Sequence, residues 1–358
     1  SYIASPLDTL TPKMLEADTR WLLVIPMIIA LRELRVSPYL ILIAFSSYAI
    51  SSFVTSAEET QYFSNLARRA NGDENAVSFG MFNASIALLI LTFFTSPFIK
   101  RDIQNKKVNL VTRAAVFIIF STACVAAYLT GSRAAILLLP IGILAIYFIH
   151  YDTRKALIGA GALLILAISI ITFSPKSAFI NKLTTTPEKI GAYFTAHDKN
   201  SRLKNQRFEQ WAESWCIFKL HPITGTGPRS FKNAHQAYGG EEHCDAIQFL
   251  PQGSYQAHSQ FFNTLGTLGI LGLTTLVIIL TALLKIAVNT RHSKNNIAQL
   301  GGALLFIALF SHLINGLTLD LLFRNHIIDK FLIVIGLPII LIFYKQTEKD
   351  QHPDADKP

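Results

Sequence analysis

Long apolar segments recur along the chain until residue 175, where the polar residues 175–257 interrupt the pattern, and apolar segments then return. A hydrocarbon core of about 30 Å is crossed by roughly 17 to 25 helical residues, and several of the segments have this length. Hydrophobic residues make up 51% of the chain and charged residues only 15%, as is typical of integral membrane proteins. We therefore expect an all-α, polytopic helical membrane protein with one large loop.

About nine apolar segments are candidates for transmembrane helices, the first of them short. They are 20–31, 36–54, 77–99, 110–130, 134–149, 156–173, 260–288, 297–319 and 327–344. The chain is thus expected to divide into four regions. They are transmembrane helices with short loops (1–174), a loop region (175–257), further transmembrane helices (258–344) and a disordered tail (345–358), which lacks the apolar content to fold.

Lys and Arg gather in every second loop, and this pattern predicts the orientation of the chain because short cytoplasmic loops are enriched in them. The basic positions are Arg32, Arg35, Lys100, Arg101, Lys106, Lys107, Arg154, Lys155, Arg291, Lys294, Lys345 and Lys349. The tail is then cytoplasmic, and the loops 58–75 and 175–257 face the opposite side. The net charge of +9 follows mostly from this pattern and does not indicate nucleic-acid binding. Because the chain would start outside, we expect further helices upstream of residue 1.

The three cysteines and the absence of metal-binding spacings limit the chemistry of the chain. Cys124 lies in an apolar segment and is expected to pack as a small apolar side chain. Cys216 and Cys244 both lie in the loop region, where an oxidising compartment permits a disulfide, and the bond and the free thiols remain equally open. No CxxC or HExxH spacing occurs, so we expect no metal and no other cofactor.

Residues 205–218 of the loop region are predicted to form an amphipathic helix. Four aromatic residues at three- and four-residue steps form an apolar stripe, which suits either the bilayer surface or the helical bundle. They are Phe208, Trp211, Trp215 and Phe218. The helix is expected to end before His221-Pro222, because a residue that precedes proline disfavours the helical conformation.

Two arginines are candidates for binding an anion at the membrane surface. Arg133 lies in the short turn between two apolar segments, where a charge costs up to about 3 kcal/mol and needs a partner. That partner is either a lipid phosphate or an anionic group of a substrate. Arg207 lies on the predicted amphipathic helix, where it is either a solvated surface charge or a ligand whose planar fork matches two phosphate oxygens.

His258 lies where the loop region re-enters the membrane. Its ordinary pKa near 6.5 suits a general base at neutral pH, although a lone histidine is more often a satisfied polar residue than a catalyst. Gly266, Gly269 and Gly272 follow at three-residue steps, which predicts a close approach between neighbouring helices.

Three motifs in this order resemble the O-antigen ligase family, which also contains O-antigen polymerases and protein O-oligosaccharyltransferases. The motifs are Thr130-Gly131-Ser132-Arg133-Ala134, the segment from Arg207 through His221-Pro222-Ile223-Thr224-Gly225-Thr226-Gly227 to Phe231, and Ala257-His258-Ser259 followed by Gly266 to Gly272. The resemblance extends from about Asp73 to Leu273.

The resemblance implies a glycosyltransferase that uses a lipid-linked donor without a nucleotide sugar or a metal. In the ligase, O-antigen polysaccharide on undecaprenyl diphosphate is transferred to a lipid A-core sugar at the periplasmic face of the bacterial inner membrane. Arg133 and Arg207 match arginines of the family and are expected to bind the donor diphosphate, and His258 matches its histidine and is expected to be the catalytic base. Further candidates, with a weaker match, are Arg324, Arg229 and His221.

Other functions remain open on the sequence. Direct attack by the acceptor predicts inversion at the anomeric carbon, since no carboxylate pair suggests a covalent intermediate.

An O-antigen polymerase is one alternative function, and it differs from the ligase mainly in its acceptor. The protein-glycosylating members usually carry a soluble region after their last helices, whereas only a short polar tail is expected here after Tyr344, which favours ligase or polymerase. A lipid or glycan transporter is the non-enzyme alternative, but its charges are expected within the spans.

Overall fold

The computed structural model describes most of the chain outside the N-terminal segment, residues 151–205, part of the remaining loop region and the tail. The described residues are 36–62, 64, 69–72, 75–102, 106–150, 206–238, 256–290, 293–320 and 325–343, with single positions 26, 29, 30 and 33. All regular structure in this part of the chain is helical, without strands. The predicted all-α fold is confirmed.

Ten helices follow one another along the described residues. They are α2 (Pro38–Glu59), α3 (Ala76–Thr95), α4 (Pro97–Asp102), α5 (Lys106–Leu129), α6 (Arg133–His150), α10 (Gln206–Leu220), α11 (Phe231–Tyr238), α12 (Gln260–Thr290), α13 (Asn296–Gly316) and α14 (Asn325–Ile342). Among them, α2, α3, α5, α12 and α13 are long and apolar enough to cross a membrane, and α6 and α14 contain shorter apolar stretches. The chain is therefore a multi-pass helical membrane protein. The expected span 156–173 and most of 20–31 lie outside the described residues.

Polar side chains fix where several helices begin. Ser37 accepts a hydrogen bond from Tyr39 N before α2, whose first residue is a proline. Asn75 accepts from the first amides of α3, and Asn295 does the same for α13. Such caps satisfy amides that have no partner inside the helix, and each contributes about 1 kcal/mol. The loops therefore specify the helix starts, and hydropathy specifies the spans.

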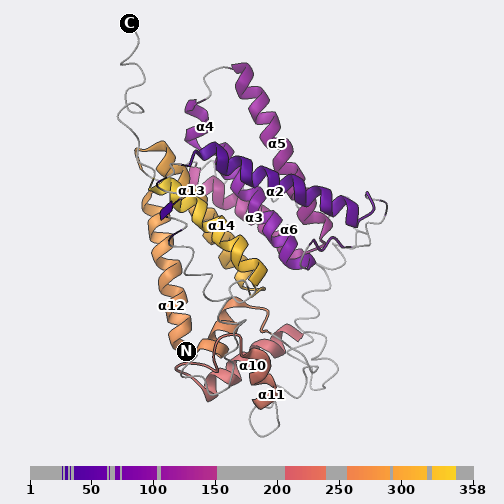
Figure 1. Cartoon of the computed structure of the whole chain (residues 1–358), viewed down its shortest axis with the longest axis vertical. Helices are drawn as coiled ribbons and strands as arrows, with labels where there is room; N and C mark the ends of the chain where they lie inside the picture. The colour runs from indigo at the N-terminus through magenta and orange to yellow at the C-terminus, as the bar shows by residue number, and fades with distance from the viewer. Residues whose placement is uncertain are drawn as a thin grey trace.

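The helices α3 and α13 form the centre of the bundle. Within the most apolar window of each helix, 78% of the residues of α3 and 67% of those of α13 are buried, against 22% for α5 and 17% for α12. Around this centre α3 packs against α5 and α6, while α13 packs against α12 and α14 (Figure 1). The outer helices expose large apolar side chains such as Phe117 and Ile278, as expected for helices that contact lipid.

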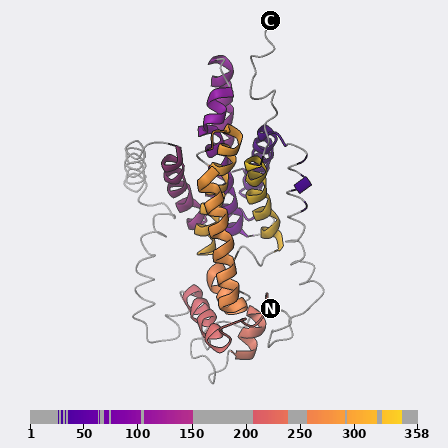
Figure 2. The ribbon, with the colours of Figure 1, turned by 90° about the vertical axis from the view of Figure 1, so that its left-hand side faces the viewer.

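The helices α10 and α11 lie together at one end of the bundle, away from α4 and the start of α5 (Figures 1 and 2). The predicted amphipathic helix is confirmed as α10, which ends at Leu220, directly before His221-Pro222. Its aromatic stripe is divided between two environments. Trp211 stacks on Phe262 of α12 with ring centroids 5.1 Å apart, whereas Trp215 remains 49% exposed. The helix is thus attached to the bundle through Trp211.

A break in α12 at Gly269 receives the loop that follows α10. In an unbroken helix the amide of Leu271 would bond to the carbonyl of Thr267. Instead, the amide of Leu271 donates to Ile223 O at 3.3 Å, and Thr267 O accepts from Gly227 N at 2.8 Å. Buried backbone groups require partners, and the loop 222–227 supplies them at the break. The loop and the helix are thereby joined through their main chains.

Two glycines allow this join. Gly269 has φ 64° and ψ −161°, a conformation that is essentially restricted to glycine. A Cβ atom at Gly269 would collide with the carbonyl oxygen of Ile223, and one at Gly225 would collide with the backbone of Thr267. The predicted close approach is confirmed at Gly266, where a Cβ would lie 3.2 Å from Ser214 O of α10. The break itself was not predicted.

Replacing Gly269 by alanine is expected to destabilise the join between the loop and α12. The unfavourable backbone conformation alone costs about 1 to 3 kcal/mol, and the collision with Ile223 adds to it. Gly269→Ala should therefore lower the thermal unfolding temperature of the detergent-solubilised protein by several degrees. Thr275→Ala is the matched control, because Thr275 is an exposed residue of the same helix whose hydroxyl bonds to Leu271 O. Equal unfolding temperatures for the two variants would contradict this account of the break.

Candidate functional site

Arg133 is held by a tightly bonded turn between α5 and α6. The chain reverses at Gly131, which has φ 59°. Thr130 Oγ1 accepts a hydrogen bond from Ser132 N at 3.2 Å, and Ser132 Oγ accepts from Ala135 N at 3.4 Å. Arg133 is the first residue of α6 and is half-buried. The main chain is thus held by hydrogen bonds both before and after Arg133.

A second arginine, Arg69, lies against the same turn. Its Nε donates to Thr130 O at 2.7 Å, and the next residue, Ala70, donates its amide to Leu129 O at 3.1 Å. Glu59 at the end of α2 accepts hydrogen bonds from the amides of Asn71 and Gly72. The segment 69–72 therefore joins α2 to the turn that carries Arg133. Sequence reasoning missed Arg69, because 61 positions separate it from its partner and no local pattern reports such a contact.

Arg207 and Arg133 lie close enough for their charges to interact. Arg207 is the second residue of α10, and its side chain retains contact with solvent. Burial by the surrounding protein lowers the pKa of Arg207, and the positive charge of Arg133 lowers this pKa further. The structure thus brings two of the three principal predicted site residues, which come from different parts of the chain, within electrostatic range of each other.

His258 lies in a strained turn immediately before α12. Its φ is 50°, a left-handed conformation that is uncommon for a residue with a side chain. The side chain is half-buried, and Gln256 Nε2 lies 3.4 Å from His258 Nδ1. On either side of His258, Ala257 N donates to Asn263 Oδ1 at 3.4 Å and Ser259 Oγ donates to Gly316 O at 3.3 Å. The turn is therefore attached to both α12 and the end of α13.

The helix that carries Arg207 and the helix that follows His258 pack directly on each other. The Trp211–Phe262 stack and the approach of Gly266 to Ser214 both join α10 to α12. Both contacts lie within about two turns of the arginine or the histidine. The His258 turn and Arg207 are accordingly anchored to the same helix pair at one end of the bundle.

The weaker candidates have different positions. His221 Nε2 lies 3.0 Å from the hydroxyl of Tyr238, so it links the end of α10 to α11. Arg229 has φ 57° and lies half-buried in the turn before α11. Arg324 lies outside the described residues.

The cysteines are divided between two states. Cys216 of α10 is disulfide-bonded, whereas Cys124 is a free thiol. Cys244, the third cysteine, lies outside the described residues. The disulfide at Cys216 means that α10, which also carries Arg207, is covalently constrained.

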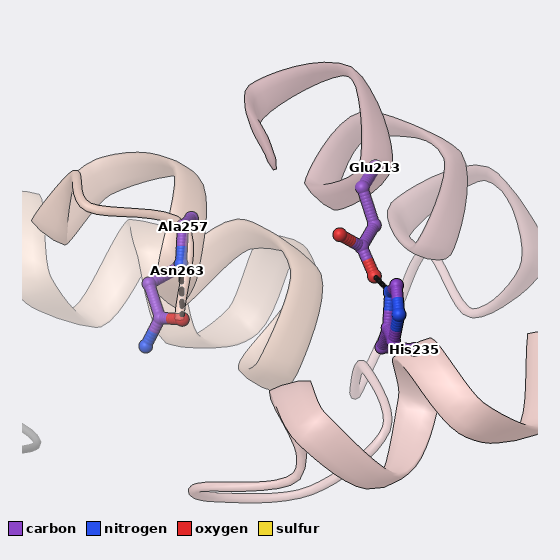
Figure 3. A network of polar contacts seen from close by, with 4 residues as sticks. All are labelled: Glu213, His235, Ala257 and Asn263. Atoms are coloured by element: carbon purple, nitrogen blue, oxygen red, sulfur yellow. Dashed lines mark hydrogen bonds and ion pairs between the residues drawn. The ribbon is translucent and has the colours of Figure 1, made fainter. Parts of the chain in front are cut away.

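A buried ion pair joins α10 to α11 beneath the surface of this region. Glu213 Oε1 lies 2.7 Å from His235 Nδ1, and the two side chains are 0% and 10% exposed (Figure 3). The hydrogen bond to Glu213 raises the pKa of His235, with burial acting against it. Burial raises the pKa of Glu213, and the bond to His235 opposes this shift. The pair was not predicted, because its members lie on separate helices.

A known protein family is similar to this region of the chain. Residues 115–277 match the O-antigen ligase family. This match confirms the resemblance indicated by the three motifs and includes Arg133, Arg207 and His258, while residues 73–114 of the expected resemblance lie outside it. No curated protein matches the chain. The matched segment covers less than half of the 358 residues and shows that this region is similar to a family of ligase- or polymerase-type glycosyltransferases.

The Glu213–His235 pair predicts how the stability of this protein varies with pH. Both pKa values are raised by folding, so the folded state binds more protons, and stability falls as the pH rises from about 4.3 for Glu213 and from about 6.5 for His235. In Glu213→Gln the remaining cause, burial, lowers the pKa of His235. The decline of the unfolding temperature above about pH 6.5 should then disappear or reverse.

Glu209→Gln is the control for this measurement, since it removes a buried carboxylate of the same helix and leaves the pair intact. It should keep the decline above about pH 6.5. Parallel pH curves for wild-type protein and Glu213→Gln would show that the pair does not titrate as inferred.

Proposed function

We propose that this protein is an O-antigen ligase, which transfers O-antigen polysaccharide from undecaprenyl diphosphate to a lipid A-core sugar. The reaction would take place at the periplasmic face of the bacterial inner membrane, with residues 175–257 as the periplasmic loop region. The observation that carries the proposal is the pair Arg133 and Arg207, two interacting cations from separate helices within the family segment. Such a pair suits a ligand with two negative groups.

The donor supplies those groups. As the bond between the anomeric carbon and the diphosphate oxygen breaks, the electron pair remains on the diphosphate, and its negative charge increases. Fixed guanidinium groups in partly desolvated surroundings stabilise that charge, and their planar forks match phosphate oxygens. The lowered pKa of Arg207 supports this role, because it reports both desolvation and the neighbouring charge. Arginines would thus provide the counter-charge without a metal ion or another cofactor.

His258 would act as the base. It would take the proton from the acceptor hydroxyl as the hydroxyl oxygen forms its bond to the anomeric carbon, so that one displacement inverts the configuration. A base that acts through Nε2 needs its proton on Nδ1. The side-chain amide of Gln256, 3.4 Å away, provides the required acceptor when its oxygen faces the ring. Retained configuration in the product would contradict this single displacement.

The weaker candidates would have supporting roles in this proposal. Arg229 and Arg324 would add positive charge for the donor, and His221 would support α11 through its contact with Tyr238. O-antigen polymerase and protein O-oligosaccharyltransferase remain the alternatives within the family, and transport of a lipid or glycan remains the alternative outside it.

Lipopolysaccharide from a strain in which the gene is deleted distinguishes these functions. Loss of a ligase should leave polymer on undecaprenyl diphosphate and unsubstituted lipid A-core. Cores capped by a single repeat would indicate a polymerase, and glycoprotein loss with unchanged lipopolysaccharide would indicate a protein-glycosylating enzyme. A transporter would be indicated by lipid-linked glycan that accumulates on the cytoplasmic side. Electrophoresis of lipopolysaccharide shows whether the core is substituted, and extraction of the lipid-linked pool shows whether polymer remains on undecaprenyl diphosphate.

Substitution of the two arginines tests the diphosphate assignment in reconstituted vesicles that contain the lipid-linked donor and lipid A-core. Arg133→Ala and Arg207→Ala are each expected to reduce transfer by about 100-fold or more, as for other preorganised donors. The lysine variants should recover only part of the activity, because lysine lacks the bidentate fork.

Arg113→Ala is the matched control for the arginine series. Arg113 is an exposed arginine of α5, roughly 25 Å along the helix from Thr130, and its replacement should leave transfer unchanged. Full activity in both Arg133→Ala and Arg207→Ala would overturn the assignment.

A further inference from the structure

We propose that Asn263 is a positioning residue for the catalytic turn and that Asp320 fixes the orientation of its amide. The inference rests on the proposed function, since it gives His258 the role of base. Asn263 lies on α12, one turn after His258, and Asp320 lies just beyond the end of α13. Each side chain is 2% exposed. Two buried polar groups, one from α12 and one from the loop after α13, therefore meet directly behind the turn.

The contacts use both ends of the amide. Asn263 Oδ1 accepts from Ala257 N at 3.4 Å, as Figure 3 shows, and Asn263 Nδ2 donates to Asp320 Oδ2 at 2.7 Å. An ionised carboxylate only accepts hydrogen bonds. Asp320 therefore determines that the nitrogen of the amide faces it and that the oxygen faces the turn. Without this partner the amide could rotate and present a donor to another donor, Ala257 N.

The hydrogen bond to Ala257 acts on the residue next to His258. The left-handed conformation of His258 costs about 1 to 3 kcal/mol, and such a conformation persists only where the surroundings over-determine it. Asn263 holds the chain before His258, and the bond from Ser259 Oγ to Gly316 O holds the chain after it. The main chain of the base is therefore fixed on both sides by the bundle.

Loss of this restraint should alter the rate of the chemical step more than the binding of the donor. Displacement of a catalytic group by about 1 Å costs on the order of 100-fold in rate. Because Asn263 holds the histidine and the diphosphate is assigned to Arg133 and Arg207, a change at Asn263 should lower kcat and leave KM for the donor near its wild-type value. A loss of donor binding would instead appear in KM.

An exchange of the two side chains tests the arrangement. Asn263→Asp removes the donor and places a second carboxylate against Asp320, so kcat should fall about 10- to 100-fold. Asp320→Asn keeps an acceptor for Asn263 and should have a mild effect. The double variant Asn263→Asp with Asp320→Asn restores both hydrogen bonds, because the new carboxylate accepts from Ala257 N and from the amide at 320. Its kcat should return to within about three-fold of the wild-type value.

Kinetics of glycosyl transfer in vesicles, with lipid-linked donor and lipid A-core, provide the readout. Asn263→Ala, which removes both bonds without adding a charge, should also lower kcat, and it keeps the test valid if Asn263→Asp does not fold. Asn83→Leu is the control, since Asn83 is equally buried and its amide bonds to Phe79 O within α3. It should keep the wild-type kcat.

Two outcomes would overturn the inference. They are a wild-type kcat in Asn263→Ala, and a double variant that is folded, as judged by its unfolding temperature, but has a kcat still below one third of the wild-type value. His258→Gln separates this inference from the proposed function. If His258→Gln is inactive while Asn263→Ala is fully active, only the positioning role fails. If His258→Gln is fully active, the role of the base fails, and with it the proposed mechanism.

Discussion

The candidate site depends on hydrogen bonds between the backbone of α12 and the loop 222–227. A helix interrupted near a membrane leaves amides and carbonyls that lipid cannot satisfy, so an interruption is tolerated only where protein or water supplies partners. Here the loop supplies them at Gly269. The break therefore attaches the loop region to the bundle through main-chain bonds, and Gly225 and Gly269 allow the two backbones to approach this closely. Through this attachment α10 is held beside the helix that begins next to His258.

Electrostatics divides this region into two parts with opposite arrangements. Between α10 and α11, Glu213 and His235 form a buried pair in which opposite charges compensate each other. At the start of α10 two positive charges interact instead. Burial lowers the pKa of Arg207, and the positive charge of Arg133 lowers it further, whereas Glu213 raises the pKa of His235. The first arrangement joins two helices of the loop region. The second is the one for which we propose an anionic ligand.

Much of the bundle could be predicted because hydropathy is a local property. The length of the apolar segments predicted the membrane-spanning helices that the structure describes. The proline after His221 predicted the end of α10. The break at Gly269 could not be predicted from the glycine spacing, since the same residues also permit close helix packing, which does occur at Gly266. Arg69 and the partner of Glu213 were missed for a related reason. Their contacts join segments 61 and 22 positions apart, and the residue types alone do not indicate such partners.

The segment that matches the family contains the three principal candidates but not all of their support. Arg69 and Asp320 lie on either side of residues 115–277. The first bonds to the turn of Arg133 and the second to the amide behind the His258 turn. One of these residues lies in the loop after α2 and the other in the loop after α13. The proposed chemistry lies within the matched segment, whereas the contacts that hold its turns extend to residues outside that segment. A change in how α13 packs against α12 would reach His258 through Asp320 and Gly316, although neither residue belongs to the matched segment.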